Sequence, residues 1–181
     1  MRRKIEELML QVADLPIFEK TATLFEVLLG IGMLRKKNPS VGLRYPGVLV
    51  SDGNRNIVGF LDFRNMLKGL EPRYFEMAES VEKSGFPPGW VRSELEKYGL
   101  HGNALDQLCK KTGDTTILEL MTVPGAKEIT DSDASVNEVI YQMVVTGNDF
   151  LFVRSGNLLV GVINISDILT YICDVVKGCR I

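Results

Sequence analysis

The residues of this sequence that could perform chemistry are few, and their spacing excludes the commonest active sites. His101 is the single histidine, so one chain cannot supply a pair of histidine metal ligands, and a Ser-His-Asp triad would need this residue. Cys109, Cys173 and Cys179 form no C-x-x-C pair, which indicates neither a zinc site nor a disulfide framework. Cys109 and His101 could in principle form a nucleophile pair, but we expect a structural cysteine and a solvated turn histidine.

Motifs for phosphate and nucleic-acid binding are missing from the sequence as well. Gly30-x-Gly32 lacks the third glycine and the lysine of a phosphate-binding loop. Asp131 and Asp133 lie close together, but roles in a turn and in helix capping explain them. The basic cluster at residues 35–37 adjoins an expected loop and not a recognition helix, so DNA binding is not indicated.

Composition narrows the class of protein further. The 181 residues carry 21 basic and 23 acidic side chains, a net charge of −2 that is too even for binding nucleic acid through general basicity. No apolar run approaches the roughly 18 residues of a membrane span, and Glu6-Glu7 interrupts the segment where a signal peptide would be apolar. We therefore expect a soluble, cytoplasmic protein with no nucleic-acid or membrane partner.

An internal repeat organises the chain. Aligning residues 5–28 with residues 117–140, a shift of 112, gives eight identities in 24 positions, where average composition gives about one or two. The identities include the pairs Leu8-Met9 and Leu120-Met121. A second block aligns residues 50–54 with residues 153–157. We interpret the sequence as a tandem duplication.

Each copy predicts the order strand-helix-strand-strand-helix after a short helical lead-in. Capping boxes mark three helix starts: Thr116 with Glu119, Thr23 with Glu26, and Ser135 with Glu138. The first long helix of each copy has an apolar stripe: Leu24, Val27, Leu28 and Ile31, and then Val136, Val139, Ile140, Met143 and Val144. The last helix of the second copy carries Ile168, Leu169, Ile172, Val175 and Val176. Turns at residues 52–54 and 155–157 suit tight hairpins.

Two segments fall outside the repeat. Residues 35–46 form a basic, proline-containing passage, for which we expect a loop that faces water or an anion. Residues 69–115 form an insert, in which we expect a helix over residues 90–98 ended by Gly99. A second helix is expected from an Asn103 cap to about Lys111, ended by Gly113. We interpret the insert as a helical bridge packed on the repeats.

The duplicated β-α-β-β-α unit resembles a tandem pair of cystathionine-beta-synthase (CBS) domains of the free-standing bacterial type. The resemblance rests on the segments that enter the last helix of each copy, residues 57–67 (IVGFLDFRNML) and 159–169 (LVGVINISDIL), and on the Leu-Met lead-ins. It implies an α+β fold of two packed motifs, residues 5–68 and 116–176, with residues 69–115 as a helical insert.

The resemblance also implies a regulatory module, not an enzyme, that binds an adenosine-containing ligand between the motifs: AMP, ADP, ATP or S-adenosylmethionine. In such motifs a hydroxyl residue contacts phosphate, and an Asp three residues later accepts hydrogen bonds from the ribose. The second copy has Asn164 and Asp167 at these positions. We expect Ile163, which adjoins them, to be a ligand-binding residue as well, and Ile129 and Thr130 to lie against the base. Asp167 would equally stabilise its own helix as a first-turn carboxylate.

The first copy departs from this pattern. Asp62 stands at the hydroxyl position and Asn65 at the Asp position. A carboxylate beside a phosphate costs about 1 kcal/mol or more, unless a metal ion or Arg64 compensates. We therefore expect this degenerate half-site to be silent or altered, so that Asp167→Ala, and not Asp62→Ala, abolishes stabilisation by a nucleotide.

Two functional hypotheses follow from different classes. The first is an adenosine-sensing module that signals through a homodimer, which the uncovered apolar helix faces and the resemblance favour, and that acts on a separately encoded effector protein. The second is a ligand-free dimer for structure or protein interaction, which the degenerate first half-site favours. Nucleotide binding would distinguish the two hypotheses.

Overall fold

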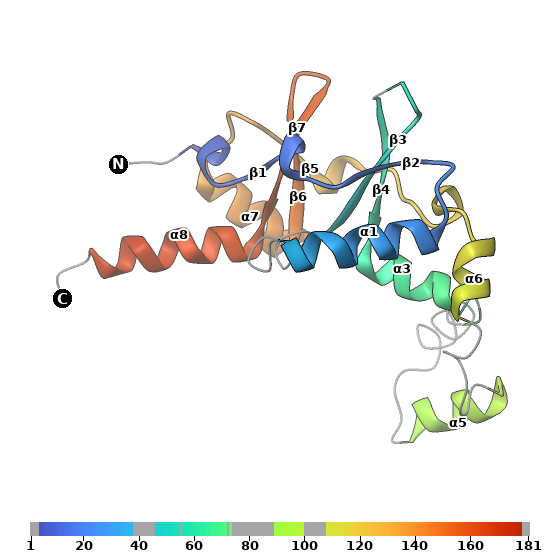
Figure 1. Cartoon of the computed structure of the whole chain (residues 1–181). Helices are drawn as coiled ribbons and strands as arrows, with labels where there is room; N and C mark the ends of the chain where they lie inside the picture. The colour runs from blue at the N-terminus through green and yellow to red at the C-terminus, as the bar shows by residue number, and fades with distance from the viewer. Residues whose placement is uncertain are drawn as a thin grey trace.

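Two β-sheets carry the two copies of the repeat, with helices packed below them in the view of Figure 1. The computed structural model describes residues 4–37, 46–54, 56–71, 73, 89–99 and 108–178. The first copy comprises the 3-10 helix η1 (Ile5–Glu7), β1 (Leu10–Gln11), η2 (Val12–Asp14), β2 (Ile17–Glu19), α1 (Leu24–Lys37), β3 (Gly47–Ser51), β4 (Ile57–Asp62) and α3 (Phe63–Leu70). The insert contributes α5 (Trp90–Lys97) and α6 (Leu108–Asp114). The second copy comprises η3 (Ile117–Glu119), η4 (Ala126–Glu128), β5 (Ile129–Asp131), α7 (Val136–Thr146), β6 (Phe150–Ser155), β7 (Leu158–Asn164) and α8 (Ile165–Lys177).

The two copies build their sheets by the same pairing. β2 runs parallel to β3, which pairs antiparallel with β4, and β5, β6 and β7 repeat this arrangement. The antiparallel pairs even shift register at equivalent places, at Val50/Ser51 and at Val153/Arg154. The predicted strand-helix-strand-strand-helix order is confirmed in both copies.

Local signals placed most helix starts correctly. The backbone N–H groups of Thr23 and Ser135 donate to the glutamates three residues later at 2.8 and 2.7 Å, so both long helices begin with the predicted capping boxes. At Thr116 the hydroxyl donates to Glu119 at 2.7 Å, but its oxygen caps no backbone N–H, and only one 3-10 turn follows. The third capping box is therefore half formed.

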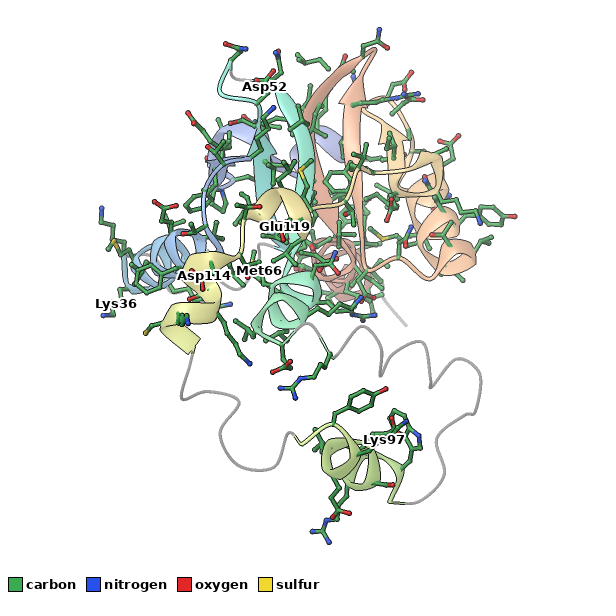
Figure 2. The ribbon with its side chains drawn as sticks, turned by 90° about the vertical axis from the view of Figure 1, so that its right-hand side faces the viewer. Lys36, Asp52, Met66, Lys97, Asp114 and Glu119 are labelled. Atoms are coloured by element: carbon green, nitrogen blue, oxygen red, sulfur yellow. The ribbon has the colours of Figure 1, made fainter. Side chains whose placement is uncertain are left out.

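Several predicted boundaries need correction. The β6–β7 turn has two residues, whereas the β3–β4 loop spans five because Ser51 pairs with Ile57. Figure 2 shows Asp52 in this loop, at the end of the molecule opposite Lys97. Residues 35–37 form the last turn of α1 and not a loop, and α6 continues through Gly113. His101, Asn103, Cys179 and residues 38–45 lie outside the described residues.

The lead-in of each copy packs on the other copy. Ile5 and Leu8 of the first lead-in lie in the core of the second copy, while Ile117 and Leu120 lie in the core of the first. β1 pairs antiparallel with β7, and Thr122 bonds to Phe60 of β4 through both backbone groups at 2.8 Å. This exchange joins the two copies, because neither core is complete without residues from the other.

A shared apolar layer fills the space between the two sheets. Leu10, Leu49, Phe60, Phe152 and Val162 are buried in it. The ring of Phe60 lies 5.0 Å from that of Phe152, in an edge-on arrangement that aromatic pairs favour. Among the described residues, no helix combines the length and the apolar character needed to cross a bilayer.

A buried carboxylate fastens the insert to the first copy. Glu71 follows α3, is 3% exposed, and accepts hydrogen bonds from Arg73 and from Lys111 of α6, each at 2.6 Å. Arg73 also donates to the backbone oxygen of Tyr98, at the end of α5, at 2.7 Å. The Arg73 hydrogen bond, assisted by Lys111, lowers the pKa of Glu71 to about 2.

Replacing Glu71 by Gln should lower the free energy of unfolding at pH 7 by about 2 kcal/mol, because the two cations lose their partner. The lowered pKa means that this stabilisation is present above the unfolded-state pKa, near 4.5, and is lost as the pH falls toward 2. Urea unfolding at pH 7 and pH 3 measures both effects. Asp174→Asn is the control, because its pair with Lys177 is exposed. Equal losses in the two variants would contradict the role of Glu71.

Candidate functional site

A cavity of about 500 Å³ lies where β4 and β7 end and α3 and α8 begin. Both copies line it, so it lies between the two motifs. The first copy contributes Pro46, Asp62, Phe63 and Arg64, and the second contributes Glu128, Gly147, Asn148, Asp149, Phe150 and Asn164. We refer to this cavity as the inter-copy cleft.

Helix capping explains why Asp62 and Asn164 meet at the inter-copy cleft. Asp62 precedes α3 with an extended backbone and accepts a hydrogen bond from the backbone N–H of Asn65 at 2.6 Å. Asn164 occupies the same place before α8, and its backbone N–H donates to Asp167 at 3.4 Å. The repeat thus brings the starts of two helices to one cavity, and a helix start carries partial positive charge.

Two phenylalanine rings give the inter-copy cleft apolar walls. Phe63 begins α3, and the guanidinium of Arg35 lies 5.5 Å from the centre of its ring. Phe150 begins β6, and its ring packs 5.2 Å from Phe60 and 5.5 Å from Phe152. Because Phe60 and Phe152 belong to the layer between the sheets, the core of the protein supports the wall that Phe150 forms.

Acidic side chains outnumber basic ones among the described residues that line the inter-copy cleft. Asp62, Glu128 and Asp149 contribute carboxylates, and Arg64 contributes the one guanidinium among the described lining residues. Glu128 is held by the backbone N–H of Gly125, which donates to its carboxylate at 2.7 Å. Within the described part of the chain, no three His, Cys, Asp or Glu side chains gather as metal ligands. The cleft therefore suits a neutral, cationic or weakly anionic ligand better than a polyphosphate.

Several solved structures with this arrangement of elements are CBS domain proteins. A CBS domain-containing protein of unknown function from Kribbella flavida is 17% identical, and the match covers 98% of this chain and all of the other with a TM-score of 0.55. CBSX2, solved in complex with AMP, is 14% identical over 95% of this chain and 97% of its own, with a TM-score of 0.56. CbpB, solved in complex with c-di-AMP, is 16% identical over 97% of this chain and 87% of its own, with a TM-score of 0.53. The chain folds as a tandem CBS pair.

Sequence searches do not add to this structural likeness. Neither a protein-family model nor a curated protein sequence matches the chain. The assignment as a CBS pair rests on the fold, together with the internal repeat that the sequence carries. At these low identities the likeness establishes the fold and leaves the ligand to be argued from this CBS pair's own residues.

The expected site residues of the second copy do not all lie at one cavity of the CBS pair. Asn164 lines the inter-copy cleft. Asp167 lies three residues later, in the first turn of α8, is 9% exposed, and is not among the described lining residues. Ile163 is fully buried in the core of the second copy, so its side chain does not face the cleft. Thr130 is buried in β5, and Ile129 lines a different cavity. Strand alternation gives the reason for Ile163: its neighbour Asn164 faces the cleft, so Ile163 faces the other way.

The first half-site also differs from the expected arrangement. Asp62 lines the same cavity as Asn164, so the two half-sites of the CBS pair open into one cleft. Asn65 bonds to Asp62 through its backbone and is not among the lining residues. Sequence reasoning missed Phe63, Glu128 and residues 147–150. The repeat offered one signal, because aligning residues 50–54 with 153–157 also pairs Pro46 with Asp149, and both line the cleft.

Proposed function

We propose that this CBS pair is a regulatory module that binds an adenosine-containing ligand in the inter-copy cleft. The observation that carries the proposal is the meeting of two helix starts, at Asp62 and Asn164, between the rings of Phe63 and Phe150. Aromatic faces suit a purine base, and helix starts suit a phosphate. The complexes of CBSX2 with AMP and of CbpB with c-di-AMP support the same ligand class for this fold. Catalysis forms no part of the proposal.

Each part of the ligand has a candidate partner in the inter-copy cleft. The base lies against Phe63 and Phe150, and Asn164 and the first N–H groups of α8 hold a single phosphate. Asp167, three residues after Asn164, is the carboxylate that we place against the ribose hydroxyls; it is 9% exposed and lies behind the described lining of the cleft, so the ribose must reach it past Asn164. Arg64 is the cation available to a second anionic group. This arrangement favours AMP or the sulfonium of S-adenosylmethionine over ATP, because the carboxylates of the cleft repel additional phosphates.

Replacing Asp62 by Asn should raise the affinity for AMP about fivefold, which corresponds to about 1 kcal/mol. Asparagine caps a helix as well as aspartate does, so α3 keeps its cap while the cleft loses one negative charge. Isothermal titration calorimetry with AMP measures the effect. Asp52→Asn is the matched control, because Asp52 lies in the distant β3–β4 loop shown in Figure 2. Unchanged AMP affinity in Asp62→Asn would place the phosphate away from Asp62.

We also propose that the module acts as a homodimer through its helical faces. On α8, Leu169, Val175 and Val176 are 54, 49 and 57% exposed, and on α7 Val144, from the predicted apolar stripe, is 75% exposed. Exposed apolar side chains on both helices suit a self-complementary interface. Light scattering at micromolar concentration should give the mass of a dimer. A monomeric mass would reject this part of the proposal and leave ligand binding untouched.

The alternative of a ligand-free interaction dimer draws on one specific observation, the three carboxylates of the inter-copy cleft. It predicts a dimer that binds none of AMP, ADP, ATP, NAD and S-adenosylmethionine.

A further inference from the structure

A second cavity, of about 220 Å³, lies between the two β-hairpins and shares no described lining residue with the inter-copy cleft. Leu49 and Ile57 of the first copy form one wall, and Ile129, Phe152 and Leu159 of the second copy form the other. We refer to it as the hairpin cavity. An engineered apolar cavity of about 150 Å³ binds benzene, so the hairpin cavity is large enough for one aromatic ring.

A difference between the two lead-ins accounts for the hairpin cavity. In the first lead-in, η2 is followed by Leu15, which is 5% exposed and packs in the layer between the sheets with Leu49 and Phe152. Under the shift of 112, the second copy has Lys127 at this position, and Lys127 is exposed. The second lead-in lines the cavity with Val123 and Pro124, but it has no counterpart of Leu15, and we infer that the volume which this leucine fills in the first copy stays open in the second.

An unfilled apolar cavity lowers the free energy of unfolding of the protein. Unfilled apolar volume lowers stability because the lining side chains lose packing contacts. A leucine in place of Lys127 would correspond to Leu15 of the first copy. The chain instead keeps a partly enclosed and mainly apolar cavity with a few polar residues, which is a common form of small-molecule site.

The polar residues of the hairpin cavity indicate the chemistry of the ligand. Arg154 and Asn157 come from the end of β6 and from the two-residue turn that follows. Arg154 is about half exposed, and its Nε donates to Asp131 at 3.1 Å. The planar guanidinium and the amide are both suited to a carboxylate, and the guanidinium can hold one through two parallel hydrogen bonds.

We propose that the hairpin cavity binds a small planar apolar molecule that carries a carboxylate. The ring lies between Leu49 and Phe152, and the carboxylate meets Arg154. The site is separate from the adenosine site of the inter-copy cleft, but the walls of the two cavities pack on each other, because the ring of Phe152 in the hairpin cavity lies 5.5 Å from the ring of Phe150 in the cleft. A ligand here would fix the position of Phe152 and so act on the wall against which we place the base.

Benzoate and benzyl alcohol test the proposal as two probes of nearly equal shape, of which one carries the charge. Methyl NMR of the full chain reports the site directly, because Leu49, Ile57, Ile129 and Leu159 place methyl groups around it. Benzoate should shift these methyl signals with a Kd in the millimolar range or below, while the methyl groups of Ile5 and Leu8 in the second-copy core stay unchanged. Benzyl alcohol should bind at least fivefold more weakly, because it cannot pair with Arg154.

Two variants separate the ring from the carboxylate. Leu159→Phe fills the hairpin cavity and should abolish the shifts caused by both probes. Arg154→Gln, at a half-exposed position, should weaken benzoate at least fivefold and leave benzyl alcohol unchanged. The proposal is overturned if about 10 mM benzoate shifts none of the cavity methyl signals. It is equally overturned if Leu159→Phe, folded as judged by its spectrum, binds benzoate as the wild type does.

Discussion

The Phe60→Ala protein should unfold with a free energy about 4 kcal/mol lower than that of the wild type. Phe60 is 1% exposed and touches both aromatic neighbours in the layer between the sheets, so truncation removes buried area and leaves a cavity. Urea unfolding followed by circular dichroism measures the change. AMP affinity should fall as well, because Phe150 of the inter-copy cleft loses the ring that supports it.

Two further variants control this experiment. Phe25→Ala removes the same side chain from a position on α1 that is 38% exposed, and it should cost about 1 kcal/mol. Phe60→Leu keeps most of the buried volume and remains measurable if Phe60→Ala fails to fold. The importance of the shared layer is contradicted if Phe60→Ala costs no more than Phe25→Ala.

Replacing Gly161 by Ala should cost about 3 kcal/mol, because the exchanged lead-in passes directly over this residue. A Cβ atom at Gly161 would lie 2.5 Å from the backbone oxygen of Leu10 and 2.6 Å from the sulfur of Met9. The backbone contact cannot be relieved by a rotamer change, so β1 must move and its pairing with β7 is lost. Differential scanning calorimetry measures the loss.

Gly32→Ala is the matched control for Gly161. Gly32 lies inside α1, and a Cβ atom there meets no heavy atom within 4 Å. Alanine favours a helix over glycine, so this variant should be more stable than the wild type by about 1 kcal/mol. Opposite signs for the two variants support the lead-in exchange, and a neutral Gly161→Ala would argue against it.

The sequence predicted the architecture because the repeat and the capping residues act locally. The identities between residues 5–28 and 117–140, with the glutamates at positions 26 and 138, fixed the order of elements and the starts of α1 and α7. The exchange of lead-ins could not be predicted in this way. A repeat says which segments are equivalent, but it does not say whether Leu8 packs on its own copy or on the other, because both cores offer equivalent apolar surfaces.

The candidate site was predicted less completely, for a related reason. Asn164 and Asp62 could be found because each stands at a fixed place before a helix. Glu128 and Phe150 are brought to the same cavity by strand pairing, and no spacing in the sequence connects them to Asn164. Ile163 is buried in the core of the second copy, and strand alternation predicts this placement once Asn164 is assigned to the cleft.

Calorimetric titration of AMP into the wild type and into Asn164→Asp tests the central claim most directly. Aspartate keeps the cap of α8 but adds a fourth carboxylate at the place where we put the phosphate. The account predicts that the wild type binds one AMP per chain, and that Asn164→Asp binds at least tenfold more weakly with an unchanged unfolding temperature in the absence of ligand. Equal binding by the two proteins, or no binding of AMP, ADP, ATP, NAD or S-adenosylmethionine by the wild type, would contradict an adenosine site in the inter-copy cleft.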